Sequence, residues 1–228
     1  DVIAGRMGKF ENREIALHDT EIFRQRLETA FRENCELQDY VARWCHEFKI
    51  PLAAGLLMVE KLTDAPGRQA LREQLEKMNA QVRSMLSGCR LQSSLVDFQI
   101  KRTDLRQCVK ASVRNNQFFL IQGDFELDVQ VEERYVCTDP QWLVYVLDQL
   151  VDNALKYAGE KPEKKLRFWT EGGGASISLL VEDRGEGIKE SDIRRIYERG
   201  FTGSNYHNGR YRSTGMGLYM VEKILRRL

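Results

Sequence analysis

The sequence has few of the residues that build covalent or metal-held frameworks. Its cysteines are odd in number and widely scattered, and no two of them form a CxxC pair. A disulfide framework or a zinc site is therefore not expected, and a reducing compartment fits better. The five cysteines are Cys35, Cys45, Cys89, Cys108 and Cys137.

Long apolar runs and an excess of charge of one sign are also missing. The longest uncharged apolar stretch, 51–59, is far shorter than the roughly 18 residues of a membrane-spanning helix. The net charge is +1, although 30% of the residues are charged. We therefore expect neither nucleic acid nor a polybasic lipid anchor as a partner. Because the chain begins with Asp1 rather than Met, we interpret it as part of a longer protein.

The first half of the chain, from about residue 19 to 94, has a helical pattern. The segment 63–67, TDAPG, breaks it and predicts an antiparallel hairpin of two helices. The second helix has a seam with steps of four and three, typical of a coiled coil. Since such a hairpin exposes an apolar stripe, we predict a homodimer built on a four-helix bundle. The seam residues are Leu71, Leu75, Met78, Val82, Met85 and Cys89.

After about residue 97 the pattern becomes mixed. Alternating or β-rich segments predict strands, and helical segments lie between them. The overall class is therefore α+β, with the helical hairpin followed by a two-layer α/β sandwich domain. The expected strands are 125–129, 134–137, 166–169 and 176–181, and the expected helices are 104–116, 139–158 and 216–228.

One of these helices has a polar face near its end. Asp139 and Pro140 are typical of a helix start, and Gly159 is expected to close the helix as its C′ residue. Four polar side chains share one face of this helix by their spacing. A solvated helix face is the ordinary interpretation of this pattern taken alone. The four are Gln149, Asp152, Asn153 and Lys156.

Two glycine-containing turns favour a nucleotide site instead. The segment 183–187, DRGEG, ends a strand with a carboxylate that can accept a hydrogen bond from an amine. The segment 213–218, STGMGL, opens a final helix whose free N–H groups suit phosphate. Neither the dinucleotide fingerprint nor a Walker P-loop is present. Each piece is weak alone, but their order and spacing together indicate nucleotide binding.

These motifs resemble those of a bacterial sensor histidine kinase of two-component systems. The segments QLVDNALKYA, EDRGEGI, YERGFTG and STGMGLYMV are similar to the N, G1, F and G2 boxes, in family order. The stretch WCHEFKIP resembles the phosphoacceptor H-box. The resemblance spans about residues 37 to 228 and is greatest to the intramembrane-sensing, envelope-stress subgroup.

The resemblance implies a different function for each of three parts of the chain. Residues 1–36 would form a signalling helix or linker, and 37–97 a dimerisation and histidine phosphotransfer domain. Residues 98–228 would form a Bergerat-type ATP-binding domain that lacks its last strands. His46 would be the phosphorylated nucleophile and Glu47 its catalytic partner, and the phosphoryl group would then pass to an aspartate of a response regulator.

The resemblance also assigns the nucleotide-binding residues. Asn153 would coordinate the Mg²⁺ that bridges the ATP phosphates. Asp183 would recognise the adenine amino group, and Arg210 and Arg212 are lid candidates for contact with the γ-phosphate. The remaining residues would contact or shape the ATP site. They are Lys156, Tyr157, Gly185, Gly187, Thr214, Gly215, Gly217 and Leu218.

Two departures from related patterns refine these expectations. ATP-hydrolysing relatives of this fold have a glutamate four residues before the asparagine, but this chain has Gln149, which cannot act as that base. Many histidine kinases have a polar residue after the H-box lysine, but this chain has Ile50, so we expect weak phosphatase activity. Upstream transmembrane segments would make this chain the cytoplasmic portion of a plasma-membrane protein.

Three other functions were weighed against the kinase. A degenerate kinase that only docks a regulator would lack His46, Asn153 or Asp183, and all three are present. A non-kinase ATPase of the same fold is disfavoured by Gln149 and by the His-Glu pair. A purely structural coiled coil explains the first half of the chain and none of the second.

Overall fold

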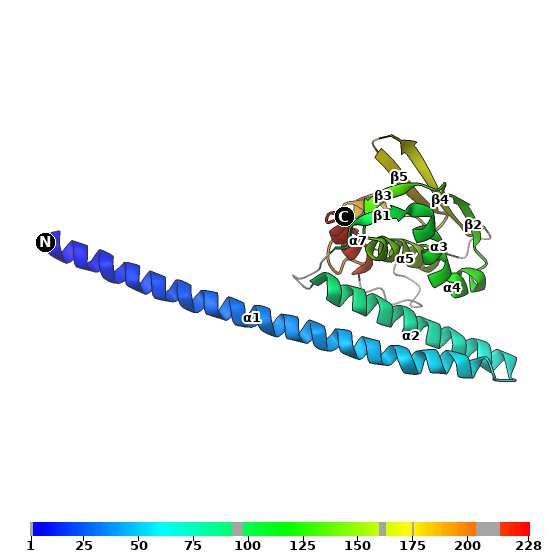
Figure 1. The fold of residues 1–228 in the computed structure, drawn as a ribbon, viewed down its shortest axis with the longest axis horizontal. Coiled ribbons are helices and arrows are strands. Elements are labelled where there is room, and N and C mark those ends of the chain that lie inside the picture. Colours follow the sequence, from blue (N-terminus) through cyan, green and yellow to red (C-terminus); the bar gives the residue numbers. More distant parts are fainter. Residues whose placement is uncertain (1, 93–97, 160–162, 175, 204–214) are drawn as a thin grey trace. The chain divides into compact units, whose positions relative to one another are not determined.

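The computed structural model describes residues 2–92, 98–159, 163–174, 176–203 and 215–228. Contacts divide the chain into two compact units, Asp1–Val96 and Asp97–Leu228. The elements are labelled in Figure 1. Their bounds are α1 Val2–Val59, α2 Ala65–Gln92, β1 Lys101–Asp104, α3 Leu105–Asn115, α4 Gln117–Gln122, β2 Glu126–Gln130, β3 Tyr135–Thr138, α5 Pro140–Lys156, β4 Lys165–Gly173, β5 Ser176–Asp183, α6 Glu190–Ile193 and α7 Gly217–Leu225.

The first unit is a helical hairpin, as the breaker segment predicts. Asp64 starts α2, because its side chain accepts a hydrogen bond from the Gly67 N–H at 3.0 Å and its carbonyl accepts one from the Arg68 N–H. Helix α1 continues through Pro51 and through residue 36, so neither position interrupts it. In the described residues, no helix combines the length and apolar character needed to cross a lipid bilayer.

The hairpin buries little of its apolar surface. Among the described side chains, those buried on α1 are Cys45, Leu52 and Val59, one heptad apart, and the one buried on α2 is Leu86. The α2 seam residues Leu71, Met78 and Met85 are about half exposed. The single hairpin therefore covers the predicted seam only in part, the buried Leu86 is not one of its members, and the side chain of Cys89 lies outside the described residues.

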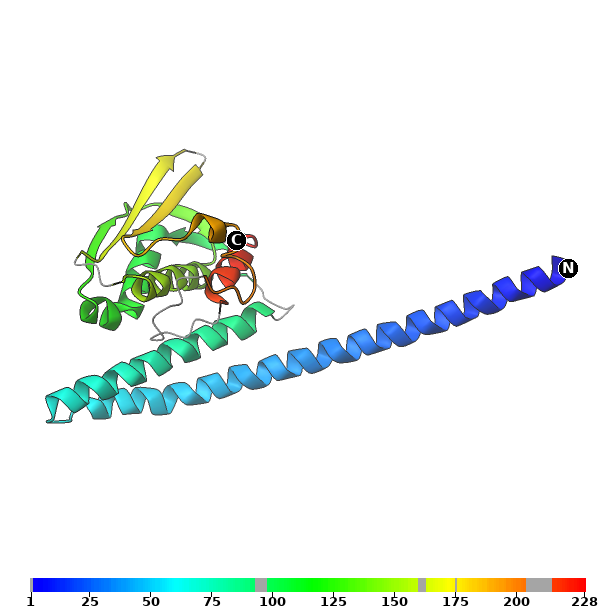
Figure 2. The same ribbon diagram turned by 180° about the vertical axis from the view of Figure 1, so that it is seen from behind.

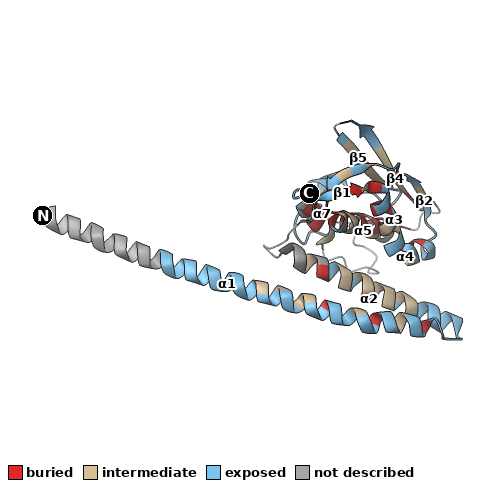
Figure 3. Cartoon of the chain, viewed as in Figure 1, coloured by how far each residue is buried: buried red, intermediate tan, exposed pale blue. Residues whose placement is uncertain are grey.

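The second unit is a sheet covered on one face by helices. Strand β4 lies between β2 and β5, parallel to β2 and antiparallel to β5. Side chains alternate along β4, so that Leu166 and Phe168 are fully buried against the helices (Figure 3) while Lys165 and Arg167 lie on the other face. Figure 2 shows β4 and β5 extending as a hairpin. The core is formed chiefly by α3, α5 and β4.

The expected strands and helices of this unit are present, with differences at their edges. Strands β1 and β3 form a separate two-stranded antiparallel sheet, so the strands are not all hydrogen-bonded into one sheet. The sequence pattern missed β1, α4 and the short α6. Helix α5 ends at Lys156 with Tyr157 as its cap, so the expectation that Gly159 is the C′ residue was wrong. Gly159 lies one residue further on, in a left-handed conformation with φ of 65°.

The aspartate that caps the start of helix α5 accepts several backbone hydrogen bonds. The Asp139 carboxylate accepts backbone hydrogen bonds from Gln141 at 2.8 Å, Trp142 at 3.2 Å and Gln99 at 2.9 Å, and Asp139 is 5% exposed. The cap therefore fixes both the helix start and the chain that enters this unit.

The free cysteines include Cys108, whose pKa is raised to about 11 by burial and by the nearby Asp104.

Replacing Asp139 with alanine is expected to lower the free energy of unfolding by about 1–2 kcal/mol, because buried N–H donors would lose their acceptor. Asp104→Ala is the matched control, since this N-cap of α3 accepts one backbone hydrogen bond, from Arg106, and is less buried. Urea denaturation followed by circular dichroism measures both. Equal losses in the two variants would contradict the role given to Asp139.

Candidate nucleotide and phosphoacceptor site

The polar face of α5 forms one side of the candidate nucleotide site. Asn153 and Gln149 are half-buried on this helix, one turn apart. The side chain of Asn153 has no hydrogen-bond partner among the described residues. Its amide oxygen is therefore available as a ligand of the type that Mg²⁺ prefers. Lys156 makes an ion pair with Asp152, one turn back on the same helix.

The G1 turn packs directly on the end of α5. The Glu186 N–H donates to the Tyr157 carbonyl at 2.8 Å. A methyl group at Gly185 would lie 2.5 Å from that carbonyl oxygen, so only glycine fits there. The Asp183 carboxylate accepts a hydrogen bond from the Gly185 N–H at 2.8 Å through Oδ1. Asp183 is exposed, and this hydrogen bond fixes the orientation of its side chain.

The start of α7 lies against the same helix. A methyl group at Gly217 would lie 2.7 Å from Oε1 of Gln149, which places the G2 turn next to the polar face of α5. Met220, Val221 and Ile224 are buried and anchor α7 in the core. The N-terminal turn of a nine-residue helix, whose first N–H groups have no partner within the helix, is thus held beside Gln149, one turn from Asn153 on α5. Leu218 is half-buried in that turn.

The F-box segment meets the G2 turn through glycine. The Gly200 N–H donates to the Gly215 carbonyl at 3.0 Å, and both glycines have left-handed φ angles. A methyl group at Gly215 would lie 2.6 Å from the carbonyl oxygens of Gly200 and Phe201. Sequence reasoning missed Gly200, although its place at the end of YERG just before the lid segment was a usable signal. Thr214, Arg210 and Arg212 lie outside the described residues.

The structure thus brings together the N, G1, F and G2 segments around the end of α5. Gly187, with φ of 77°, has no atom within 4 Å of the position that a Cβ would take. Gln149 is the residue that α5 directs at the G2 turn, and an amide cannot take a proton from water. Among the described residues, no three His, Cys, Asp or Glu side chains form a metal cluster.

The phosphoacceptor candidate lies in the other unit. His46 is exposed on α1, and its neighbour Cys45 is buried. Because residues one apart differ by about 100° around a helix, His46 and Glu47 both point away from α2. Ile50 is 75% exposed, one turn after His46.

Comparison with known proteins finds relatives of the kind that the sequence motifs resemble. Residues 138–228 match the family of histidine kinase-, DNA gyrase B- and HSP90-like ATPases. The sensor protein BceS of Bacillus subtilis is 29% identical over 86% of this chain and 58% of its own length. The sensor protein kinase GraS of Staphylococcus aureus is 28% identical over 93% of this chain. The chain spans 59% of the length of GraS.

Solved structures share the fold. The Acinetobacter baumannii histidine kinase AdeS superposes with a TM-score of 0.51 at 21% identity, covering 82% of this chain and 85% of AdeS. Full-length ShkA, solved with AMPPNP, gives a TM-score of 0.54 at 20% identity over 82% of this chain and 40% of ShkA. By its ATPase domain, which covers residues 138–228, and by its curated relatives, the chain is similar to the bacterial sensor histidine kinases of two-component systems.

Proposed function

We propose that the chain is an ATP-dependent protein-histidine kinase that phosphorylates itself on His46 and then passes the phosphoryl group to an aspartate of a response regulator. The observation that carries this proposal is the meeting of four motif segments at the end of α5, in a chain that also exposes a histidine next to a carboxylate. A kinase needs both a nucleotide site and an acceptor.

We assign the nucleotide contacts to the residues around α5. Asp183 would accept a hydrogen bond from the adenine amino group through the oxygen that does not bind Gly185. Gly185 and Gly187 let the ring approach the backbone, and the first N–H groups of α7, near Gly215 and Gly217, would bind phosphate. Lys156, Tyr157, Thr214 and Leu218 would complete the site, with Arg210 and Arg212 as lid residues.

Asn153 fits the metal that ATP chemistry requires. Asn153 is half-buried one turn after Gln149, which lies at the α7 N-terminus, and its side chain has no hydrogen-bond partner among the described residues. When bound, Mg²⁺ would neutralise the charge that develops on the phosphates during transfer. The protein would hold the ion in position and exclude water around it. Gln149 stands where a carboxylate could act as a base, and an amide cannot activate water in that way.

His46 would supply the nucleophile. Its unprotonated ring nitrogen attacks the γ-phosphorus, so that a P–N bond forms and the bond from phosphorus to the ADP oxygen breaks. The other ring nitrogen keeps its proton, and Glu47 would accept a hydrogen bond from it and stabilise the positive charge that develops on the ring. Exposure of His46 on α1 lets the ATP-binding unit and then the regulator reach it in turn.

We further propose that the hairpin works as a homodimer. Trp44, Phe48 and Met58 are 44%, 51% and 68% exposed on α1, and α2 adds its half-exposed seam. A second hairpin would cover these side chains in a four-helix bundle while leaving His46, on the opposite side of α1, accessible. The functional division into 1–36, 37–97 and 98–228 and the place of the chain on the inner side of a plasma membrane belong to the same proposal.

The proposal is tested by incubating the chain with Mg²⁺ and γ-labelled ATP. Acid-labile, alkali-stable label is expected on the wild type, because that stability is typical of phosphohistidine. Asn153→Ala should reduce labelling by at least about 100-fold, since one ligand in a preorganised site is removed. Asn115→Ala is the matched control, because Asn115 is an exposed asparagine on α3 that bonds Asp148. Acid-stable label, or full labelling of Asn153→Ala, would overturn the assignment.

A further inference from the structure

The sheet of the second unit has one open face. Helices cover the face to which Leu166 and Phe168 point, and the side chains that alternate with them lie on the opposite face. This open face has a hollow of about 120 Å³, several times the roughly 15 Å³ that one water molecule requires. Charged side chains from β2, β4 and β5 and from the residue after β5 line it. They are Asp128, Lys165, Arg167, Glu182 and Arg184.

Arg167, in the middle of this hollow, is incompletely hydrogen-bonded. Its Nε atom is buried and has no hydrogen-bond partner among the described residues, although Oδ2 of Asp128 lies 3.4 Å away. Its Nη2 atom donates to Oε1 of Gln130 at 3.4 Å, which is longer than a usual hydrogen bond. The guanidinium stacks over the Trp169 ring at 4.7 Å, and this contact holds its plane. A fixed guanidinium with N–H groups to spare is suited to bind two oxygens of an oxyanion.

The other two cations of the hollow are paired with glutamates that do not line it. Lys165 donates to Glu126 at 2.6 Å, and Arg184 donates to Glu163 at 2.9 Å. The side chains of these glutamates are 68% and 79% exposed. Ion pairs with partners this exposed contribute little free energy. Both cations can therefore turn to a ligand in the hollow at small cost.

The carboxylate nearest to Arg167 along the sheet is not used to neutralise it. Glu182 lies directly opposite Arg167 in the register of β4 and β5. Its side chain is exposed, and in the part of the chain that the structure describes it makes no hydrogen bond or ion pair. Opposite charges at such positions ordinarily stabilise a sheet by pairing across the strands. Because these two groups do not bond each other, the donors of Arg167 are left for a ligand.

We propose that this hollow binds a phosphate group, held by the guanidinium fork of Arg167 and by the charges of Lys165 and Arg184. The hollow lies on the opposite face of the sheet from α5, so it is distinct from the phosphate contacts assigned near α7. It adjoins the G1 turn all the same, because Arg184 stands between Asp183 and Gly185 and its N–H donates to the Lys165 carbonyl at 3.2 Å. The proposal does not depend on the kinase activity.

Titration calorimetry of the full chain with inorganic phosphate tests this site. The titration is run with and without saturating ADP, and the same saturable binding is expected in both, because ADP would occupy the other face of the sheet. Glycerol 3-phosphate is titrated in parallel, and a difference between the two probes tells a free phosphate ion from a phosphate ester as the ligand. Binding of phosphate only in the absence of ADP, or no saturable binding of either probe, would overturn the proposal.

Arg167→Gln should weaken phosphate binding at least about tenfold, because the charged fork that holds two oxygens is lost. Arg102→Gln is the matched control. Arg102 also stacks on an aromatic ring, that of Tyr135 at 4.2 Å, but it lies on β1 and does not line the hollow. Its phosphate affinity should equal that of the wild type. Equal affinities of Arg167→Gln and the wild type would show that phosphate binds elsewhere.

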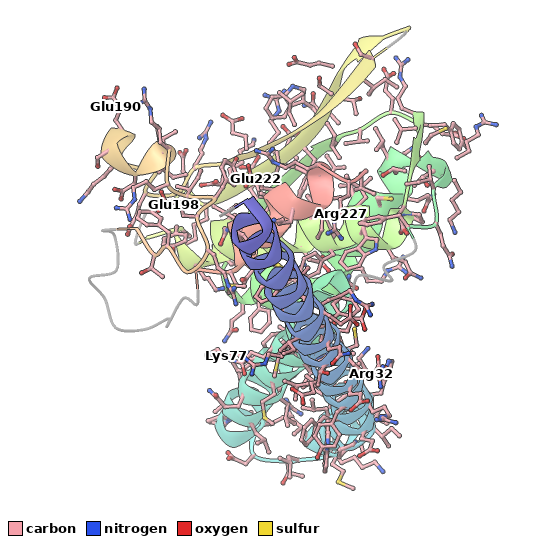
Figure 4. All side chains as sticks on the ribbon, turned by 90° about the vertical axis from the view of Figure 1, so that its left-hand side faces the viewer. Arg32, Lys77, Glu190, Glu198, Glu222 and Arg227 are labelled. Atoms are coloured by element: carbon pink, nitrogen blue, oxygen red, sulfur yellow. The ribbon has the colours of Figure 1, made fainter. Side chains whose placement is uncertain are left out.

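Glu182→Gln provides a gain of binding that a damaged fold would not produce. Removing this negative charge beside the hollow should strengthen phosphate binding about threefold. Glu190→Gln is the matched control, because Glu190 is an exposed glutamate on α6 (Figure 4). Unchanged or weaker binding in Glu182→Gln would contradict the proposed position of the anion. Phosphate binding in a chain that takes no label from ATP would refute the proposed kinase activity alone, and labelling without phosphate binding would refute only this site.

Discussion

His46→Gln is expected to reduce labelling from γ-labelled ATP to background while nucleotide affinity stays the same. Glutamine is similar in length and keeps the helix, but it has no ring nitrogen that can attack phosphorus. The nucleotide residues lie in the other unit, so the loss should be confined to transfer. Glu47→Gln should retain labelling about 100-fold slower, since a general base or charge partner typically contributes that much.

His18→Gln is the matched control for this experiment, because it makes the same change at a histidine to which no role is assigned. Its labelling should equal that of the wild type. Nucleotide affinity is measured by equilibrium titration with a fluorescent ATP analogue for each variant. Label that persists on His46→Gln would show that another residue is the phosphoacceptor. A loss of nucleotide affinity in that variant would show that His46 acts in nucleotide binding.

Gly185→Ala is expected to weaken nucleotide binding by about 100-fold, because a displacement near 1 Å in a preorganised site has effects of that size. The added methyl group would lie 2.5 Å from the Tyr157 carbonyl oxygen and 2.7 Å from Oδ1 of Asp183. Both are parts of the site, and the carbonyl belongs to backbone that cannot move aside without shifting the end of α5. Autophosphorylation should fall with binding.

Gly173→Ala is the matched control, because a methyl group there meets nothing within 4 Å. Its affinity should match that of the wild type. Asp183→Asn is a second variant that separates a loss of binding from a loss of folding. Its amide oxygen can still accept the hydrogen bond from the Gly185 N–H, but the negative charge is gone. About tenfold weaker nucleotide binding is expected. Wild-type affinity in Gly185→Ala would show that the G1 turn does not shape the nucleotide site.

Local chemistry made much of the fold predictable. Asp139 and Pro140 mark a helix start through hydrogen bonds within three residues, and the alternation in 176–181 marks β5 by the period of a pleated strand. Strand β1 was missed because KRTD has no apolar alternation and is a strand only by pairing with β3, over 30 residues away. Helix α4, QFFLIQ, is an apolar run too short for its periodicity to decide.

The residues of the candidate site could be predicted from the sequence, but the contacts between them could not. Motif resemblance identified Asn153, Asp183 and Gly217 as one set, but the approach of Gln149 to Gly217 depends on how α5 and α7 pack. The early end of α5 has a similar cause. Its last turn is followed by Tyr157, whose carbonyl accepts from Glu186 in the G1 turn. A helix continued to residue 158 would direct that carbonyl along its own axis instead.

Locating the phosphate tests the central claim most directly. The chain is incubated with Mg²⁺ and ATP, digested at alkaline pH and sequenced by tandem mass spectrometry under conditions that preserve phosphoramidates. The account predicts one modified residue, His46, carrying a single phosphoryl group. Phosphate on another residue, or an unmodified His46 in a chain shown to bind ATP, would contradict it.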